Sequence, residues 1–355
     1  MQRRVTGVVN VVARDVDSLS GGSTVSFLRR LGWSAAIGLT VVAAAACSGE
    51  KPLTTPDGSP ISTTVTRIAE VNIVSADRDY AKTCLAPTAP DPGVQDVTRV
   101  VVTDPALLDA VCALGLGAKV SAVTAEPGSV PAYLGPQLTS VPAIGSAPDS
   151  AAVTAADADL VLTTPDTAGS ARAFDGVRSV TVPIGPDGRA TDWKEQFQSV
   201  ADALGRSEAG ASRLAEYTTE ARKTGRRMDA SHTQVSLVRF GDGSETIAGM
   251  NTFAGQVLGD IGVQRPGPQR VPDSFAVTDE NFRDADADLI YVSFDGDAGR
   301  AHGEDVLLSD EWLSLGAPVW KRVLAVDDEV WYQTSGLAAA WLVLNDVKGS
   351  LDGNS

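Results

Sequence analysis

The chain has 355 residues, 43% hydrophobic and 21% charged, an ordinary globular composition that excludes a wholly disordered chain. It carries 45 Asp and Glu against 29 Lys and Arg, a net charge of −16. A broad nucleic-acid surface is therefore excluded, because phosphate binding needs a basic face. The two histidines, His232 and His302, lie far apart and the three cysteines form no CxxC, so neither residue type predicts a metal site.

Residues 1–46 have the layout of a secretory signal peptide. The apolar stretch 31–46 (LGWSAAIGLTVVAAAA) follows two arginines and is shorter than the roughly 18–20 residues needed to span a bilayer. Cys47 comes next, as in a bacterial lipobox, although Ala replaces the usual Leu three residues earlier. We predict export and lipid anchoring to the cell membrane at Cys47, with an ordinary signal peptide as the alternative. Because 1–24 would precede a normal signal, we expect the true start near Val25.

Export changes the interpretation of the other two cysteines, because disulfides persist in oxidising compartments. Cys84 and Cys112 enclose 27 residues, and we predict a disulfide that joins an N-terminal arm to the first helix of the folded body. In the chain-entropy description such a loop is worth roughly 3–4 kcal/mol. The alternative is two unpaired thiols, since Cys112 lies in the apolar run LLDAVCAL and also suits a core position.

The folded body is predicted to begin at residue 99. The preceding segment, 47–98, is rich in Thr, Pro, Ser and Asp and is interpreted as a tether and an arm, ordered around 68–74. From 99 onward, short apolar runs alternate with helical patterns, which indicates strands covered on both faces, as in parallel α/β sheets. Strands are predicted at 99–103, 120–123, 143–145, 160–163 and 180–183, with a helix from Pro105 that ends at Gly115.

Two helices divide the body into lobes. The first is predicted at 192–204, with Asp192 as its N-cap, and the second at 207–228, where 22 residues would span roughly 33 Å. The α/β pattern then restarts, with strands at 234–240, 289–293 and 322–326 and helices at 252–261 and 335–347. The echo of ADADLVL in ADADLIY supports two lobes. We predict a first lobe at 99–206, a connecting helix at 207–229 and a second lobe at 230–355.

Several segments resemble the iron-siderophore substrate-binding lipoproteins of ABC importers. They are RVVVTDPALLDAVCALGLGAKVSAV, YLGPQL, VPAIGSAPD, DWKEQFQSVADALGR and VSLVRF followed by NTFAGQVLGDIGVQRPGPQ. The paired cysteines and the arm RIAEVNIVSADRDYAKTC are similar to the actinobacterial FecB-type branch. The resemblance covers about residues 62–347. It implies the class III periplasmic-binding-protein fold, in which two Rossmann-like α/β lobes are joined by one long connecting helix.

The resemblance also implies a function. A monomeric, non-enzymatic binding protein would capture a ferric siderophore in the interlobe cleft and deliver it to an ABC permease. No cofactor is implied, because the iron arrives already chelated. Many relatives carry a Glu on an early helix, where it pairs with an Arg of the permease, but here that position is Ala151. Asp149 or Asp157 is a candidate substitute; without one, a role as a cell-envelope interaction protein gains weight.

Ligand-contacting residues are predicted from a rule that is independent of the family. In open α/β sheets, ligands meet the loops at the carboxyl ends of the strands. A ferric siderophore is bulky, partly aromatic and often anionic, so aromatic faces and guanidinium groups suit it. The predicted contacts are Tyr133, Arg239, Asn251, Phe253, Arg265, Trp331 and Tyr332.

Each of these residues has an alternative interpretation. Arg239 would equally pair with Asp242 or Glu245, and Phe253 would serve as a hydrophobic staple at a helix start. A second ligand class is haem, with Tyr133 or Tyr332 as its axial ligand. An enzyme is not predicted, because the chain contains no GxSxG, HExxH or GxxxxGK[ST] motif. The high negative charge would also favour a neutral or cationic chelate, unless a local Arg cluster offsets it.

Overall fold

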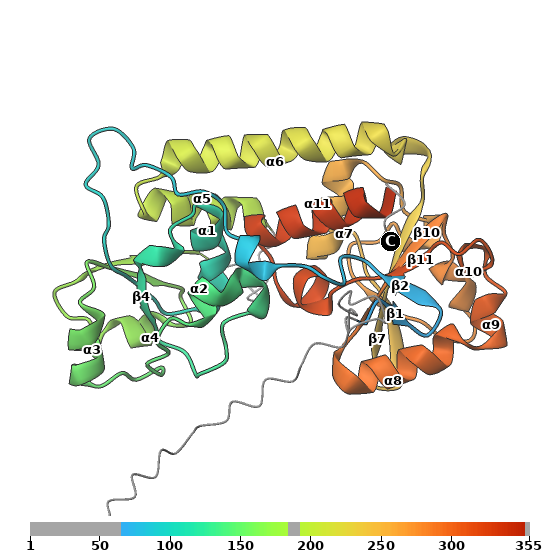
Figure 1. Cartoon of the computed structure of the whole chain (residues 1–355), viewed down its shortest axis with the longest axis horizontal. Coiled ribbons are helices and arrows are strands. Elements are labelled where there is room, and N and C mark those ends of the chain that lie inside the picture. The colour runs from blue at the N-terminus through green and yellow to red at the C-terminus, as the bar shows by residue number, and fades with distance from the viewer. Residues whose placement is uncertain (1–64, 184–191, 352–355) are drawn as a thin grey trace, which may run out of the picture. The chain divides into compact units, whose positions relative to one another are not determined.

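The computed structural model describes residues 65–183 and 192–351, all within one compact unit that extends from Ser62 to Ser355 (Figure 1). The predicted signal peptide, Cys47 and most of the tether lie outside the described residues. Within the described part, no helix is both long enough and apolar enough to cross a membrane.

The first lobe is built on a four-stranded parallel sheet in the order β4-β3-β5-β6. Its strands are fully apolar at the centre because helices cover both faces, as the continuous apolar runs predicted. The predicted strand at 143–145 is reduced to one bridge between Val123 and Ala143. The strands are β3 (Val100–Val102), β4 (Val120–Val123), β5 (Leu160–Thr163) and β6 (Arg178–Thr181).

Local caps fix the helices of the first lobe. Asp104 accepts a hydrogen bond from the Ala106 N–H ahead of the predicted helix from Pro105, and Asp192 caps α5 through the N–H groups of Lys194 and Glu195. The helices are η2 (Pro105–Leu107), α1 (Leu108–Ala113), η3 (Gly117–Lys119), η4 (Ala132–Leu134), α2 (Gly135–Thr139), α3 (Ser150–Ala156), α4 (Ala168–Ala171) and α5 (Trp193–Ala203).

The connecting helix α6 (Ser207–Arg227) lies over both lobes in Figure 1 and is close to the predicted range. Its 21 residues give a length of about 32 Å. Asp91 of the N-terminal arm caps its start by accepting hydrogen bonds from the backbone N–H groups of Ser207 and Glu208, at 2.7 and 3.1 Å. The arm therefore helps to position the helix that joins the lobes.

The second lobe contains a seven-stranded mixed sheet in the order β1-β2-β11-β10-β7-β8-β9. Strands β2, β11, β10 and β7 are parallel, and β1 and β8 run antiparallel to their neighbours. The N-terminal arm, which we predicted as a separate segment, supplies β1 and β2 to this sheet. The strands are β1 (Arg67–Ile68), β2 (Val71–Ile73), β7 (Val235–Gly241), β8 (Ser244–Ile247), β9 (Phe275–Ala276), β10 (Leu289–Phe294) and β11 (Val323–Ala325).

The remaining helices belong to the arm and the second lobe, and α11 extends from the second lobe to contact α1 and α5 of the first. They are η1 (Tyr80–Lys82), η5 (Ala230–His232), α7 (Phe253–Ile261), η6 (Gly267–Gln269), η7 (Phe282–Ala285), α8 (Gly296–Leu307), α9 (Asp310–Leu313), α10 (Gly316–Val319), the π-helix η8 (Glu329–Gln333) and α11 (Leu337–Leu351).

One hydrophobic core runs through both lobes rather than stopping at the connecting helix. Edge-to-face aromatic contacts mark the junction: Trp193 of α5 meets Tyr217 of α6 at 5.4 Å and Phe253 of α7 at 5.9 Å, and Tyr217 meets Trp341 of α11 at 5.9 Å. Asp260 of α7 binds both the Tyr217 hydroxyl and Lys194 of α5. The lobes therefore share packing at three helices besides α6.

A disulfide joins Cys84 of the arm to Cys112 of α1. The arm is also held to the first lobe by Arg206, a fully buried residue whose guanidinium binds Asp96 at 2.5 Å and the Thr88 carbonyl at 3.2 Å. Because the same arm begins in the second lobe's sheet, the chain connects the lobes through the arm and α11 as well as through α6.

Candidate functional site

On the first lobe, the carboxyl ends of β3 and β5 carry a cluster of threonines. The Thr103 hydroxyl lies 2.6 Å from that of Thr167, which is 2.9 Å from the Thr164 hydroxyl. Thr164 in turn donates to Asp104 at 3.2 Å. These hydroxyls bond to one another and to Asp104, so the first lobe offers a small polar rim with one carboxylate.

On the second lobe, Arg239 at the end of β7 lies in a charged cluster. Its Nε and Nη2 donate to the two carboxylate oxygens of Asp328 at 2.8 and 2.7 Å, and Nη2 is 3.2 Å from Asp295. Its partners are therefore Asp328 and Asp295 rather than Asp242 or Glu245. The hydrogen bonds with Asp328 raise the pKa of Arg239. The side chain stays 28% exposed and lies over the Tyr332 ring, 5.5 Å from its centroid.

Arg265, from the loop after α7, is only 5% exposed. Its Nη2 donates to the Ala248 carbonyl at 2.6 Å and to Gln269 at 2.8 Å, but Nε and Nη1 have no hydrogen-bond partner among the described residues. Burial without a counter-ion lowers the pKa of Arg265 to about 10. Two donors of a buried cation are thus left unpaired, which is costly unless a ligand or water accepts them.

Tyr332 completes the cluster. It belongs to the π-helix after β11, a rare type of helix that often occurs at functional sites. Its hydroxyl and that of Ser293, at the end of β10, are buried near each other without a normal hydrogen-bond partner in the described structure. Burial raises the pKa of Tyr332, so the hydroxyl stays protonated and able to donate. Arg265, Tyr332 and Ser293 therefore carry buried donors that lack an acceptor in the described structure. Together with Arg239 we refer to them as the arginine cluster.

Two predicted contacts need correction. Tyr133 is 1% exposed, and its hydroxyl binds Asp109 at 2.9 Å and Thr334 at 2.8 Å. Trp331 is also buried, and its Nε1 donates to Asp346 at 2.8 Å. Neither ring presents a face to a ligand, because a buried acceptor draws each one into the interlobe core.

The other two predicted contacts, Phe253 and Asn251, have no side-chain hydrogen bond or ring contact with Arg239, Arg265 or Tyr332 in the described structure. Phe253 packs edge-to-face on Trp193, which agrees with its alternative interpretation as a packing residue. Asn251 is exposed, and its backbone N–H donates to the Pro272 carbonyl. Of the seven predicted residues, the structure thus brings Arg239, Arg265 and Tyr332 together.

Sequence reasoning missed Asp328 and Ser293. Both follow the rule that found their neighbours, since Ser293 is near the end of β10 and Asp328 lies in the acidic run that follows β11. A count of charged residues after each predicted strand would have identified Asp328.

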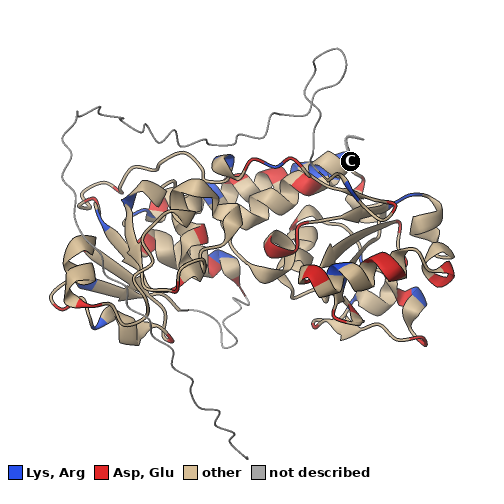
Figure 2. Ribbon diagram, turned by 60° about the horizontal axis from the view of Figure 1, so that its bottom comes forward, with Lys and Arg blue, Asp and Glu red and all other residues tan. Residues whose placement is uncertain are grey.

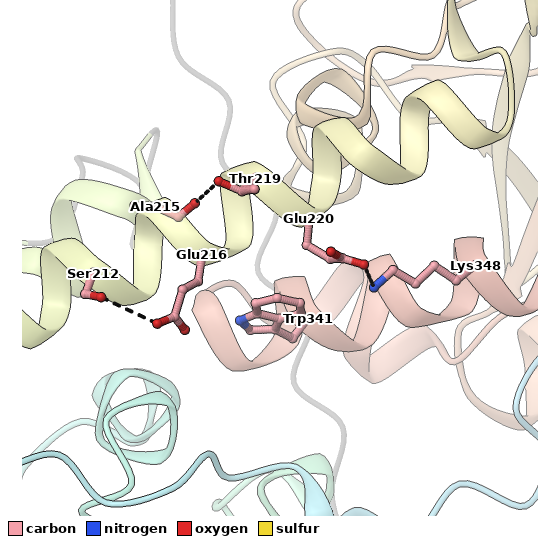
Figure 3. Close-up of a pocket in the computed structure, with 7 residues that line it drawn as sticks. All are labelled: Ser212, Ala215, Glu216, Thr219, Glu220, Trp341 and Lys348. Atoms are coloured by element: carbon pink, nitrogen blue, oxygen red, sulfur yellow. Dashed lines mark hydrogen bonds and ion pairs between the residues drawn. The ribbon is translucent and has the colours of Figure 1, made fainter.

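A hollow of about 560 Å³ between α6 and α11 is lined by Trp341, Glu216 and Glu220, and Figure 3 shows the Trp341 ring between these helices. Glu220 is paired with Lys348 at 2.9 Å, and the hollow contains none of the residues of the arginine cluster.

In Figure 2, acidic and basic residues are interspersed on the helices of both lobes, and the described part presents no continuous basic face in that view. Nor do the described residues include a group of three or more His, Cys, Asp or Glu placed to hold a metal.

Two α/β lobes with parallel central strands, joined by a long connecting helix and carrying a donor cluster near the strand ends, are the features of a two-lobe solute-binding protein. The chain belongs to the periplasmic binding protein family, whose sequence model matches residues 100–329. This is a family of binding proteins, and the fold agrees with the class III architecture expected from the sequence.

Individual relatives are more distant. The probable siderophore-binding lipoprotein YfiY of Bacillus subtilis is 26% identical over 193 residues, which are 49% of this chain and 58% of that protein. Staphylococcus aureus SirA complexed with staphyloferrin B is 19% identical, with a TM-score of 0.57 over 75% of this chain and 99% of that one. S. aureus FhuD2 with bound ferrioxamine B is also 19% identical, with a TM-score of 0.54 over 72% of this chain and 98% of that one. At these identities the solved structures establish the shared fold.

Proposed function

We propose that this chain is an extracytoplasmic binding protein, anchored to the cell membrane through Cys47, that captures a ferric siderophore between its lobes and delivers it to an ABC importer. Family membership supports the binding role. The siderophore class is supported by the description of YfiY and by the ligands bound to SirA and FhuD2. The export signal before Cys47 supports the location.

The observation that carries the proposal is the incompletely paired guanidinium of Arg265. Arg239 is neutralised by Asp328 and Asp295, whereas Arg265 has two free donors and no carboxylate partner in the described structure. A ligand oxygen that accepts from Arg265 and from the Tyr332 hydroxyl would supply the missing hydrogen bonds. We therefore favour a chelate with anionic oxygens. The chain as a whole is acidic, but the charge nearest to the bound oxygens would be that of the Arg265 guanidinium.

Haem is the weaker candidate ligand. The Tyr133 hydroxyl, one of the two axial ligands considered, is already bound to Asp109 and Thr334 in the interlobe core. Tyr332 has a free hydroxyl, but Arg239 lies over its ring. Haem therefore belongs in the experiment as a competing ligand.

Delivery to a permease would need a docking residue on the first lobe. In the first lobe, Ala151 lies exposed on α3 where many relatives carry a Glu, and Asp149 is occupied as the N-cap of α3 through the Ala152 N–H at 2.8 Å. Asp157 is exposed at the end of the same helix, 3.7 Å from Arg99. Asp157 is therefore the better substitute, and loss of iron uptake in Asp157→Ala cells would support delivery over an envelope role without transport.

The ligand is tested by titrating the exported chain carrying Cys47→Ser with ferric chelates of negative, neutral and positive net charge, and with haem. Binding is followed by tryptophan fluorescence. We expect saturable quenching by an anionic chelate, and a dissociation constant at least about thirty-fold higher in Arg265→Gln, because a buried charged hydrogen bond is lost. Gln keeps a donor for the Ala248 carbonyl, which protects the fold.

The matched control is Arg300→Gln, which removes an exposed arginine of α8 that pairs with Glu304 on the surface. It should bind like the unmodified chain. If every ferric chelate fails to bind while the chain stays folded, or if Arg265→Gln binds normally, the proposed ligand site is wrong.

A further inference from the structure

Glu329 forms a contact between the lobes that the proposed ligand site does not use. Its two carboxylate oxygens accept hydrogen bonds from consecutive backbone N–H groups of the first lobe, those of Ala132 at 3.0 Å and Tyr133 at 3.1 Å. The residues are almost 200 positions apart in the chain, so this is a tertiary contact and not a local turn. We refer to these three residues as the Glu329 bridge.

The Glu329 carboxylate is well suited to accept hydrogen bonds from the two N–H groups of the bridge. Ala132 and Tyr133 begin the 3₁₀ helix η4, where the first N–H groups have no partner within the helix, and the preceding Pro131 provides no side-chain cap. A carboxylate that accepts from both groups supplies the missing cap, and hydrogen bonds to an ionised acceptor are stronger than neutral ones. A neutral amide at position 329 would supply one acceptor oxygen and direct an NH₂ group at the second donor.

Glu329 is also the first residue of the π-helix that carries Tyr332. Other side chains fix the remainder of this short helix: Trp331 donates to Asp346, and Gln333 donates to Asp328, the partner of Arg239. The π-helix is therefore attached to the first lobe at its first residue and to the arginine cluster near its last.

Tyr133 strengthens the same connection. Its backbone N–H binds Glu329, while its hydroxyl binds Thr334, just beyond the π-helix, and Asp109 of α1. Asp109 also accepts from the N–H groups of Ala338 and Ala339 at the start of α11. The segment from Glu329 to Ala339 is thus bound to the first lobe at both ends.

We propose that Glu329 is a positioning residue for ligand binding, which holds the lobes at a fixed separation and keeps the Tyr332 hydroxyl beside Arg265. The part that concerns the ligand rests on the proposed function. The part that concerns the contact between the lobes does not, and it is measured without any ligand.

The contact is tested by amide hydrogen exchange in the Cys47→Ser chain. We expect the N–H groups of Ala132 and Tyr133 to exchange at least about ten-fold faster in Glu329→Gln and Glu329→Ala. Glu126→Ala, which changes an exposed carboxylate in the same region of the first lobe, should leave their exchange unchanged. Equal exchange in all four proteins would overturn the bridge, whether or not any ligand binds.

Positioning is tested by a double-mutant cycle with a ferric chelate bound by the unmodified chain. If Glu329 acts through Tyr332, Glu329→Gln should weaken binding about ten-fold in the unmodified chain and much less in Tyr332→Phe, because the two residues share one effect. If Glu329→Gln leaves the affinity for the chelate unchanged, or weakens it equally in the unmodified chain and in Tyr332→Phe, Glu329 is only a cap for η4 and not a positioning residue. Failure of every chelate to bind would refute the proposed function and the positioning role. The exchange measurement would still show whether Glu329 binds the N–H groups of Ala132 and Tyr133.

Discussion

Replacing Asp109 by Asn should remove a specific dependence of stability on pH. Asp109 is buried in α1, and its carboxylate accepts hydrogen bonds from the Tyr133 hydroxyl and from the N–H groups of Ala338 and Ala339. Burial raises its pKa from 3.8 to about 6, although these hydrogen bonds favour the ionised form. No basic side chain compensates the charge in the described structure.

The sign of the effect follows from proton binding. Because the pKa is higher in the folded state, the folded chain holds the proton more tightly between about pH 4 and pH 6. The stabilisation is complete below the unfolded pKa and is lost as the pH rises through the folded pKa. A gap of about two pH units, at 1.36 kcal/mol per unit, corresponds to about 3 kcal/mol.

Denaturant unfolding of the unmodified chain and of Asp109→Asn at pH 4, 5, 6 and 7 measures this quantity. The free energy of unfolding of the unmodified chain, minus that of the variant, should fall by about 2.4 kcal/mol from pH 4 to pH 7, because the carboxyl of the unfolded chain is already more than half ionised at pH 4. Other carboxylates cancel in the difference. Asp297→Asn, an exposed position on α8, should give a flat difference. A flat difference for Asp109→Asn, or one that rises with pH, would refute the reasoning.

Two other predictions concern stability. Reducing the Cys84–Cys112 disulfide should lower the free energy of unfolding by roughly 3–4 kcal/mol, measured with and without a thiol reductant; an unchanged midpoint would contradict this. Gly225→Ala should destabilise the chain by about 1–3 kcal/mol, because its Cβ would lie 1.9 Å from the Ile261 carbonyl oxygen where α6 crosses α7. Gly259→Ala, with nothing within 4 Å of its Cβ, should be neutral or slightly stabilising, and equal losses in both variants would show that the close approach is not the cause.

The central strands and the long helices were predictable because their apolar patterns are local. The predicted helix 207–228 differs from α6 by one residue, and the strand predicted at 289–293 differs from β10 by one. Strands β1 and β2 were not predicted as sheet members, because segments of two and three residues carry no periodicity. Their place is decided by β11, which lies about 250 residues further along the chain.

The grouping of Arg239 and Tyr332 near the strand ends was predictable, whereas the burial of Tyr133 and Trp331 was not. Rules about strand ends located Arg239 and Tyr332, since charged and polar groups at that edge face solvent or ligand. They could not separate a ligand-facing ring from a buried one. That decision depends on Asp109 and Asp346, two buried carboxylates in apolar helices that draw in Tyr133 and Trp331.

The strand order of the second lobe has a consequence for the nascent chain. Strand β11 lies between β2 and β10, so the first described strands reach their place only after almost the whole chain has been synthesised. Such distant pairing is expected to slow folding, whereas the Cys84–Cys112 loop between the arm and α1 closes early. A polypeptide interrupted before Val323 would leave β10 with an unpaired apolar edge, the kind of surface that chaperones and proteases recognise.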